Sequence, residues 1–409
     1  MALVLTLVVA AAGGCDSVLD VELPGKVPEE DLDDPALADA MVAGAIADFE
    51  CAYNNYTFGS AAHSDLMLPS SGNSIERTWG LRNITATFDN YVNGSCADGG
   101  YGLWTTLQTA RFQAEDVFSR LEGFTEEEVP DRTSKMATVS AYAGYAYTLF
   151  GEGFCRVRFD GGPIRDPEAA LEIAEDRFTR AIDLAQSSGT TEILHMAHVG
   201  RARVRLDLGD AAGAAADARE VPAGFEKVAT RDGPSPAVQR RWNKGAFNFV
   251  EFGHHTVAPA FRDVRWKGVE DPRVDVMDTG GVGFDGVTPL WVTTKYPERS
   301  SDIPLATWEE AQLTIAEAEG GQTAVGIIND LHDRAGLPPF DPAEDQVEGP
   351  TDDNVLNMVI EERSRELFME GGHRLRDMLR FDIPFPTGRD PQGNPFGDTT
   401  CYPLPAVEE

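Results

Sequence analysis

Two long blocks of this 409-residue sequence carry apolar residues at helical spacing, and this pattern constrains the fold more than any other feature. The first block covers about 103–220 and the second about 307–380. Within both, apolar side chains return every three or four residues, as they do on one face of a helix. The segments at about 53–101 and 221–304 are instead rich in Gly, Asn, Ser, Thr or Pro, which predicts long loops with short strands. The sequence therefore predicts a mainly all-α protein with a loop-rich, irregular region.

The first block also has small residues at positions typical of helical hairpins. Residues 197–202 read Ala-His-Val-Gly-Arg-Ala, and a Leu-Gly-Asp turn at 208–210 leads into the Ala-rich segment 214–218. Small side chains let helices pack closely, and hairpins of this kind stack into repeats. We therefore expect tetratricopeptide-like helical hairpins in this block, although an Ala-rich hairpin outside any repeat would look the same. A further helix is predicted around 37–51, ending near Cys51.

The N-terminus has the features of an export signal. Residues 2–12 form an uncharged apolar run that is too short to span a membrane as a helix, for which ~20 residues are needed. Small residues then precede Cys15, which resembles a bacterial lipobox. Ala12 stands where Leu is usual, and no Lys or Arg comes before Lys26. We expect a signal peptide at 1–14 and one mature domain at 15–409 that begins with a lipidated Cys15; a plain secretory signal or a short buried segment is the alternative.

Removing Cys15 from the count leaves four cysteines, Cys51, Cys96, Cys155 and Cys401. An even number in an exported chain is consistent with two disulfides, and four cysteines allow three pairings. No rule chooses among these pairings. We favour Cys51 with Cys96, which would close an N-terminal loop, and Cys155 with Cys401, which would tie the C-terminal tail to the helical block.

Composition and motifs narrow the function. The formal charge of −34 argues against a nucleic-acid partner, because such proteins need clustered cations to neutralise phosphates. The string Gly281–Gly286 has the G-x-G-x-x-G spacing, but neither the preceding strand nor the following helix that a dinucleotide site requires is predicted around it. His195 and His198 lack a third ligand for zinc. We therefore expect no catalytic residues, no metal and no cofactor.

The most specific sequence motif lies near the C-terminus. Glu362-Arg363, Glu366-Leu367, Glu370-Gly371, Arg374, Asp377 and Arg380 follow one another at helical intervals, with one extra residue before Arg374. This pattern resembles the signature helix of the SusD/RagB-like lipoproteins. The tail at 403–408 is similar to the Pro-Ile-Pro-x-x-Glu ending of that family. From the residues alone, Glu362, Glu366 and Glu370 are predicted to be structural, because nothing separates two of them from the surrounding charges.

The resemblance implies an α-helical superhelix of tetratricopeptide-like hairpins with the loop-rich, irregular region on one side. It also implies a non-enzymatic nutrient binder. Members of the family are lipid-anchored at the outer membrane, face the cell exterior, bind glycans or other nutrients with the loop-rich side, and cap a SusC-like TonB-dependent transporter. We expect the same function, partners and location for this chain. Two alternatives come from other classes: a secreted carbohydrate-active hydrolase, and a structural surface protein built on helical repeats.

Ligand-binding residues are predicted from side-chain chemistry. Sugars offer C–H faces that stack on aromatic rings and hydroxyls that bind polar side chains, so exposed loop aromatics with polar neighbours are the candidates. The aromatic residues and their neighbours that meet this description are Trp79 with Arg77 and Asn83, Tyr296, Trp266 and Trp291. Trp104 and Trp308 fall on predicted helices and are expected in the core.

Overall fold

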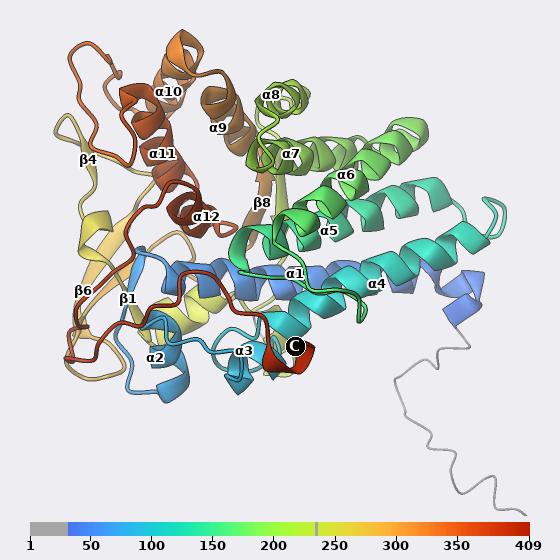
Figure 1. Ribbon diagram of the computed structural model, residues 1–409, viewed down its shortest axis with the longest axis horizontal. Helices are drawn as coiled ribbons and strands as arrows, with labels where there is room; N and C mark the ends of the chain where they lie inside the picture. The colour runs from blue at the N-terminus through green and yellow to red at the C-terminus, as the bar shows by residue number, and fades with distance from the viewer. Residues whose placement is uncertain (1–31, 234–235) are drawn as a thin grey trace, which may run out of the picture.

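A computed structural model describes residues 32–233 and 236–409, and this part of the chain is mainly helical (Figure 1). The α-helices are α1 (Ala38–His63), α2 (Ser74–Gly80), α3 (Asp89–Asn93), α4 (Trp104–Gly123), α5 (Arg132–Gly153), α6 (Glu168–Ser188), α7 (Thr191–Asp207), α8 (Ala211–Arg219), α9 (Trp308–Glu319), α10 (Gly321–Ala335), α11 (Asn354–Glu366) and α12 (His373–Arg380). Shorter helical turns are η3 (Pro35–Leu37), η4 (Pro236–Arg241), η5 (Ala246–Glu251), η6 (Pro259–Phe261) and η7 (Ala406–Glu408). The signal segment 1–14 and Cys15 lie outside the described residues.

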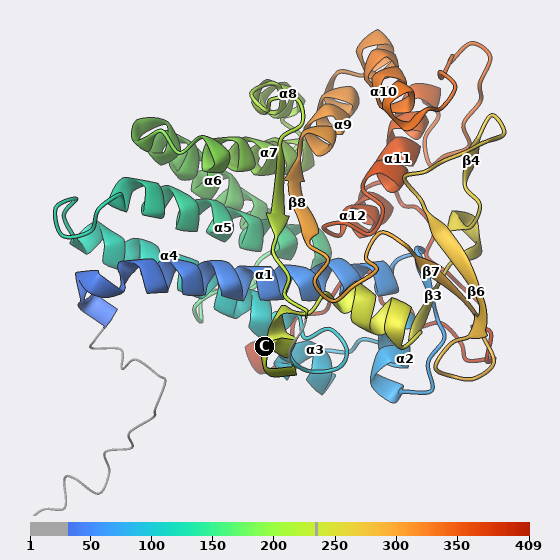
Figure 2. The same ribbon diagram turned by 180° about the vertical axis from the view of Figure 1, so that it is seen from behind.

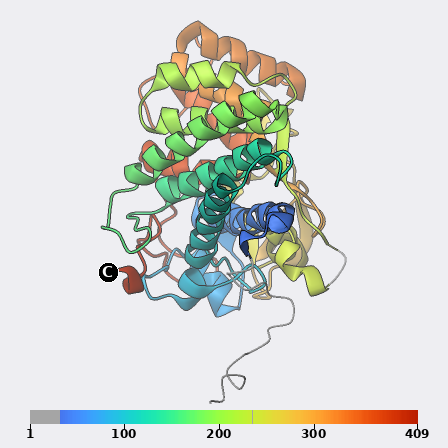
Figure 3. The same ribbon diagram turned by 90° about the vertical axis from the view of Figure 1, so that its right-hand side faces the viewer.

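Helices α4 to α9 form the predicted superhelix. Each packs on the next in chain order, and the views from the front and the side show them stacked in successive layers (Figures 1 and 3). The fold class expected from the sequence is confirmed.

Close approach between these helices depends on small residues around one ring. Phe178 of α6 is fully buried, and its ring lies against Gly144 of α5 and Gly200 of α7. A Cβ atom at Gly144 or Gly200 would come within 2.7 or 2.3 Å of the ring. The ring therefore fills space that any larger residue at either glycine would occupy, and the three helices lock together around it.

The first helix is longer than predicted. α1 does not end near Cys51 but continues to His63, so Tyr53 and Tyr56 are helical and fully buried. Figures 1 and 2 show α1 passing through the middle of the molecule, between the helical layers and the loop-rich side. A helix covered on all sides carries no polar face, so the alternation that marks amphipathic helices is missing from residues 53–63.

The strands of the described chain form four antiparallel pairs. The pairs are β1 (Met67–Pro69) with β3 (His255–Val257), β2 (Glu226–Ala229) with β8 (Ile303–Thr307), β4 (Arg265–Trp266) with β5 (Val269–Glu270), and β6 (Val276–Val282) with β7 (Pro289–Thr293). The string Gly281–Gly286 lies at the turn of the β6–β7 hairpin, as its lack of helical context predicted.

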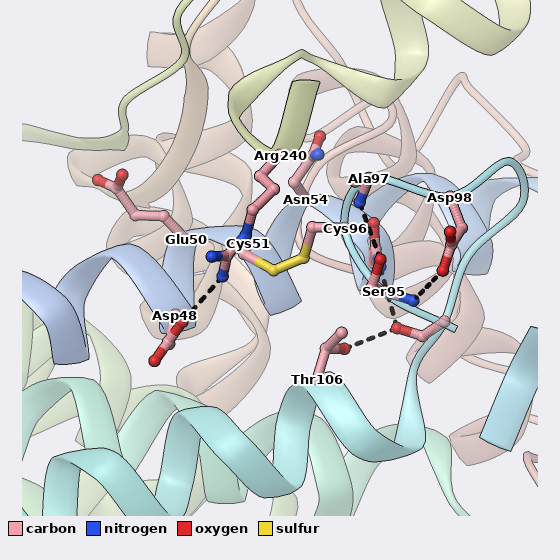
Figure 4. Close-up of a disulfide and its surroundings, with 12 residues drawn as sticks. Asp48, Glu50, Cys51, Asn54, Ser95, Cys96, Ala97, Asp98, Thr106 and Arg240 are labelled. Atoms are coloured by element: carbon pink, nitrogen blue, oxygen red, sulfur yellow. Dashed lines mark hydrogen bonds and ion pairs between the residues drawn. A yellow bond between two sulfur atoms is a disulfide. The ribbon is translucent and has the colours of Figure 1, made fainter. Parts of the chain in front are cut away.

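Both disulfides have the pairing that the sequence favoured. Cys51 of α1 is bonded to Cys96, which holds the loop between α3 and α4 against α1 (Figure 4). Cys155, just after α5, is bonded to Cys401, so the C-terminal tail is tied to the helical body.

The signature segment forms two helices, whereas its sequence pattern resembles a single signature helix. α11 ends at Glu366, and α12 starts at His373. Between them Met369, Gly371 and Gly372 all have positive φ angles, which the two glycines adopt readily. The extra residue before Arg374 thus falls at the start of α12.

Candidate functional site

Two of the four candidate rings, Trp79 and Tyr296, are not exposed. Trp79 lies on α2 with no exposed surface, and its indole Nε1 donates to Asn90 Oδ1 at 2.8 Å. Tyr296 is 1% exposed, and its hydroxyl donates to the Met369 carbonyl. The expectation of exposed stacking faces at these positions is wrong. Rings from a Gly-rich segment fill the space between the loops and α1, because such loops have few other large side chains to bury.

The other named residues are spread over the loop-rich side. Arg77 is half-buried on α2, and Asn83 is exposed just after it. Trp266 packs against Phe340 and His332. Trp291 is half-buried on β7, with the Arg262 guanidinium 5.1 Å from the centre of its ring. Ligand binding by these residues stays a prediction, and the structure does not bring the six together into one site.

A different set of rings forms a continuous surface on this side. Trp242, Phe247, Phe252, His254 and Phe284, here called the aromatic ladder, contact one another in sequence. Ring centres lie 5.4 Å apart from Trp242 to Phe247, 4.8 Å from Phe247 to Phe252 and 6.3 Å from Phe252 to Phe284. Phe252 is 41% and Phe284 52% exposed. Two large apolar rings are therefore presented to solvent side by side, which is unusual unless they have a partner.

His254 fixes the spacing between the two exposed rings. It stacks parallel to Phe252 at 5.7 Å and meets Phe284 edge-on at 4.6 Å. Its Nδ1 is 2.9 Å from the Ser71 hydroxyl, and burial lowers its pKa to about 4. The imidazole is thus neutral at ordinary pH and supports the rings without adding charge.

Backbone hydrogen bonds hold three separate segments together under the ladder. The Phe284 N–H donates to the Gly253 carbonyl, and the Asp285 N–H donates to the Ser70 carbonyl. The Ser70 hydroxyl donates to the Gly253 carbonyl at 2.8 Å. The exposed rings therefore stand on a preformed base, which lowers the entropy lost when a ligand binds.

A charged pair covers one end of the ladder, at Trp242 and Phe247. The Arg299 guanidinium lies 3.9 Å from the Trp242 ring centre and 5.1 Å from that of Phe247. Glu251 accepts two hydrogen bonds from Arg299. This arrangement offers hydrogen-bonding groups beside apolar faces, as sites for polyhydroxylated rings require.

The Cys51–Cys96 loop anchors the segment that carries the ladder. Lys244, two residues before η5, donates to the Asp98 and Gly100 carbonyls of this loop. The carboxylate of Glu76 accepts a hydrogen bond from the Gly100 N–H on the other side. Figure 4 shows the disulfide joining α1 to this loop beside Asp98. The disulfide therefore stabilises the loop to which Lys244 is bound, and through Lys244 the segment that carries the ladder.

The signature carboxylates have structural contacts instead of lying on the ladder. Glu362 accepts from Arg273 at 2.7 Å and from His332 at 2.9 Å. Glu366 also accepts from Arg273, and Glu370 pairs with Lys295. Burial raises the pKa of Glu370 despite that lysine. These pairings agree with the structural role predicted from the sequence.

Beside these residues lies a cavity of about 440 Å³ with mixed charges. Its wall includes Glu226, Asp275 and Glu309 together with Glu366, Glu370, Arg273 and Lys295. Carboxylates outnumber cations there, so the cavity is a poor match for an anionic ligand.

Sequence reasoning missed the ladder because its candidates were Trp and Tyr residues, whereas both exposed rings of the ladder are Phe. A usable signal exists: Phe247, Phe249 and Phe252 are clustered within six residues of a predicted loop. Phe249 is buried, and the other two join the ladder.

Two further searches concern only residues 32–233 and 236–409. No three His, Cys, Asp or Glu side chains converge there as metal ligands would. None of the helices in these ranges combines the length and the apolar character needed to cross a membrane.

Comparisons with known proteins agree with this architecture. The model of the SusD family matches residues 310–400, from α9 into the C-terminal tail. No curated protein sequence matches the chain significantly.

Solved structures resemble nearly the whole chain. A SusD superfamily protein from Bacteroides vulgatus has a TM-score of 0.67 and 16% identity over 91% of this chain and 96% of its own. A SusD-like carbohydrate binding protein from the same organism has a TM-score of 0.65 and 14% identity over 92% and 96%. Surface glycan-binding protein A from Bacteroides thetaiotaomicron, solved in complex with laminarihexaose, has a TM-score of 0.63 and 14% identity over 90% and 97%.

The sequence match covers the segment with the Glu-Arg, Glu-Leu and Glu-Gly pattern, and the structural matches cover the helical body and the loop-rich side together. The resemblance of this chain to the SusD/RagB-like proteins, first indicated by its C-terminal residues, is confirmed in both sequence and fold.

Proposed function

We propose that this protein captures glycans at the cell surface through the aromatic ladder and passes them to a SusC-like TonB-dependent transporter. The observation that carries the proposal is the pair of exposed rings, Phe252 and Phe284, held rigidly on the loop-rich side. The complex of a structurally similar protein with laminarihexaose supports a glycan as the ligand class.

The ladder is suited to binding a glycan without catalysing a reaction on it. Flat apolar faces can pack on the C–H faces of sugar rings, and the Arg299–Glu251 pair can bind hydroxyls at the edge. The location belongs to the same proposal: Cys15 carries a lipid, and the protein lies on the outer face of the outer membrane. Mass spectrometry of the mature N-terminus tests the lipid, and co-purification with a large β-barrel from native membranes tests the transporter.

Truncation of the exposed rings tests the ligand. Wild type is run in native gels that contain soluble laminarin, starch, dextran, xylan or pectin, and the retarding polysaccharide is then used in binding titrations. Phe252→Ala and Phe284→Ala should each weaken affinity by roughly 5- to 30-fold, as loss of an aromatic anchor does. Phe284→Tyr should retain binding, because the stacking face remains.

Phe381→Ala is the matched control, since this partly exposed ring lies at the end of α12 and outside the ladder. Its affinity should equal that of wild type. Unchanged affinity in both ladder variants, with melting temperatures also unchanged, would remove the ladder from the binding site.

A further inference from the structure

We infer that a second glycan-contacting site lies in a groove on the outer face of α4, so that one long polysaccharide chain can contact the protein at two places. This inference rests on the proposed glycan-binding function. The groove, here called the α4 groove, lies between α4 and the loop 158–162 and has a volume of about 490 Å³. This size falls within the range of ordinary ligand sites.

The α4 groove contains an exposed aromatic ring, Phe112. Phe112 is 52% exposed on α4, as much as Phe284 of the ladder. The core-facing positions of α4, such as Leu107 and Ala114, are fully buried, so Phe112 is not needed to attach the helix. A large ring on the solvent face of a helix that already has a complete apolar face calls for an external partner.

Hydrogen-bonding groups line the same groove. Thr109 and Gln113 are partly exposed beside Phe112, and their side chains make no hydrogen bond within the described part of the chain. A hydroxyl and an amide that are free next to an apolar ring give the combination a sugar needs: a stacking face with donors and acceptors at its edge.

The floor and walls are held in place by charged contacts. Arg111 is 5% exposed and binds both carboxylate oxygens of Asp160, at 2.8 and 2.9 Å. Gln108 accepts from Arg111 Nε and donates to the Arg158 carbonyl. At one end the Trp104 indole donates to Glu408.

These contacts favour a neutral ligand. Arg111 is already paired with Asp160, so the groove has little net charge to offer an ion. A ligand therefore enters walls that are already ordered, and little entropy is lost on binding.

The β6–β7 hairpin, whose turn carries Phe284, and α4 lie towards opposite ends of the molecule (Figures 1 and 2). A polymer held at the ladder would keep its remaining sugars at a high local concentration near the groove. A second weak contact then raises the overall affinity without any change at the first.

The test compares short and long ligands. Phe112→Ala should lower affinity for the retarding polysaccharide, chosen from soluble laminarin, starch, dextran, xylan and pectin, by about tenfold. Affinity for its six-sugar oligomer, which the ladder alone can hold, should change less than twofold. Phe112→Tyr should behave as wild type, and Ser119→Ala, at an exposed position on α4 away from the groove lining, controls for changes in the helix.

Each outcome separates the second site from the ladder. Loss of polymer affinity in Phe112→Ala, with the oligomer unaffected, supports the second site. Equal polymer affinity in Phe112→Ala and wild type, while Phe284→Ala binds weakly, overturns the second site and leaves the proposed function intact. Loss in Phe112→Ala with no loss in either ladder variant supports the groove and overturns the ladder, whereas no retardation by any of the five polysaccharides counts against both.

Discussion

The ionic network around α11 and α12 and the aromatic ladder differ in how their side chains are used. In the network, Arg363 is 8% exposed at its side chain and pairs with Glu317 and Asp377. In the ladder, Phe252 and Phe284 leave about half of their surface open. The network joins α9, α11 and α12, so its residues serve the fold.

This difference explains where a family pattern can be detected. Each charge of the network is buried against a specific partner, and removing one partner leaves an uncompensated charge inside the protein. Truncating an exposed ring of the ladder leaves no buried charge without a partner. The charged pattern of α11 and α12 therefore indicates the fold. The ligand has to be inferred from the exposed residues.

The largest loss of stability is expected when Phe178, a buried ring, is truncated, and it can be compared with truncation of an exposed ladder ring. Phe178→Ala should lower the free energy of unfolding by about 3–5 kcal/mol, because it opens a cavity among α5, α6 and α7 that Gly144 and Gly200 cannot fill. Phe284→Ala should lower it by less than about 1 kcal/mol, since half of that ring is already in water. Urea denaturation followed by circular dichroism measures both. Similar losses in the two variants would mean that the ladder is part of the core.

Helical periodicity predicted most of the body, because amphipathic helices such as α6 alternate between apolar and polar faces. It failed at α1, where residues 53–63 are covered on every side and the alternation disappears. It also extended the helix of α11 to Gly371, past its end at Glu366, because the break depends on the positive φ angles of Met369, Gly371 and Gly372 and not on a change in polarity.

The candidate site was less predictable than the fold. Residue type, loop composition and polar neighbours favoured Trp79 and Tyr296, yet whether a loop ring points in or out depends on contacts with other segments. Trp79 points inward because Asn90 accepts its N–H, whereas Phe284 points outward because its backbone is bound to Gly253. Neither contact is visible as a local pattern in the sequence.

An intermediate effect is expected from the disulfide beneath the ladder. Replacing Cys51 and Cys96 together by Ser should lower stability by about 2–4 kcal/mol, because the bond closes a loop with a sequence separation of 45. It should also increase hydrogen exchange at 94–102 and around Lys244, which is bound to that loop. The matched control is Cys155→Ser with Cys401→Ser, which should leave exchange around Lys244 unchanged. Loosening of the Lys244 segment in both double variants would contradict a local role for the first disulfide.

A change in the pH dependence of stability is expected at Glu310 in the buried charged region. This carboxyl lies on α9, with Arg203 Nη1 at 3.5 Å and His373 Nε2 at 3.8 Å. Burial raises its pKa to about 8, and the Glu152 and Glu370 carboxylates act in the same direction against Arg203. Between pH 4.5, the ordinary value, and pH 8 the folded chain therefore holds a proton that the unfolded chain releases.

The stability contributed by this proton is fully present below pH 4.5 and is lost as the pH rises towards 8. Glu310→Gln keeps the shape of the side chain and removes the titration. The free energy of unfolding, measured in urea at pH 5, 6, 7 and 8, should fall less steeply with pH in the variant than in wild type. The gain should be greatest at pH 8 and smallest at pH 5. Parallel curves for the two proteins would show that Glu310 is ionised in the folded state and that its neighbouring arginines, not burial, set its protonation.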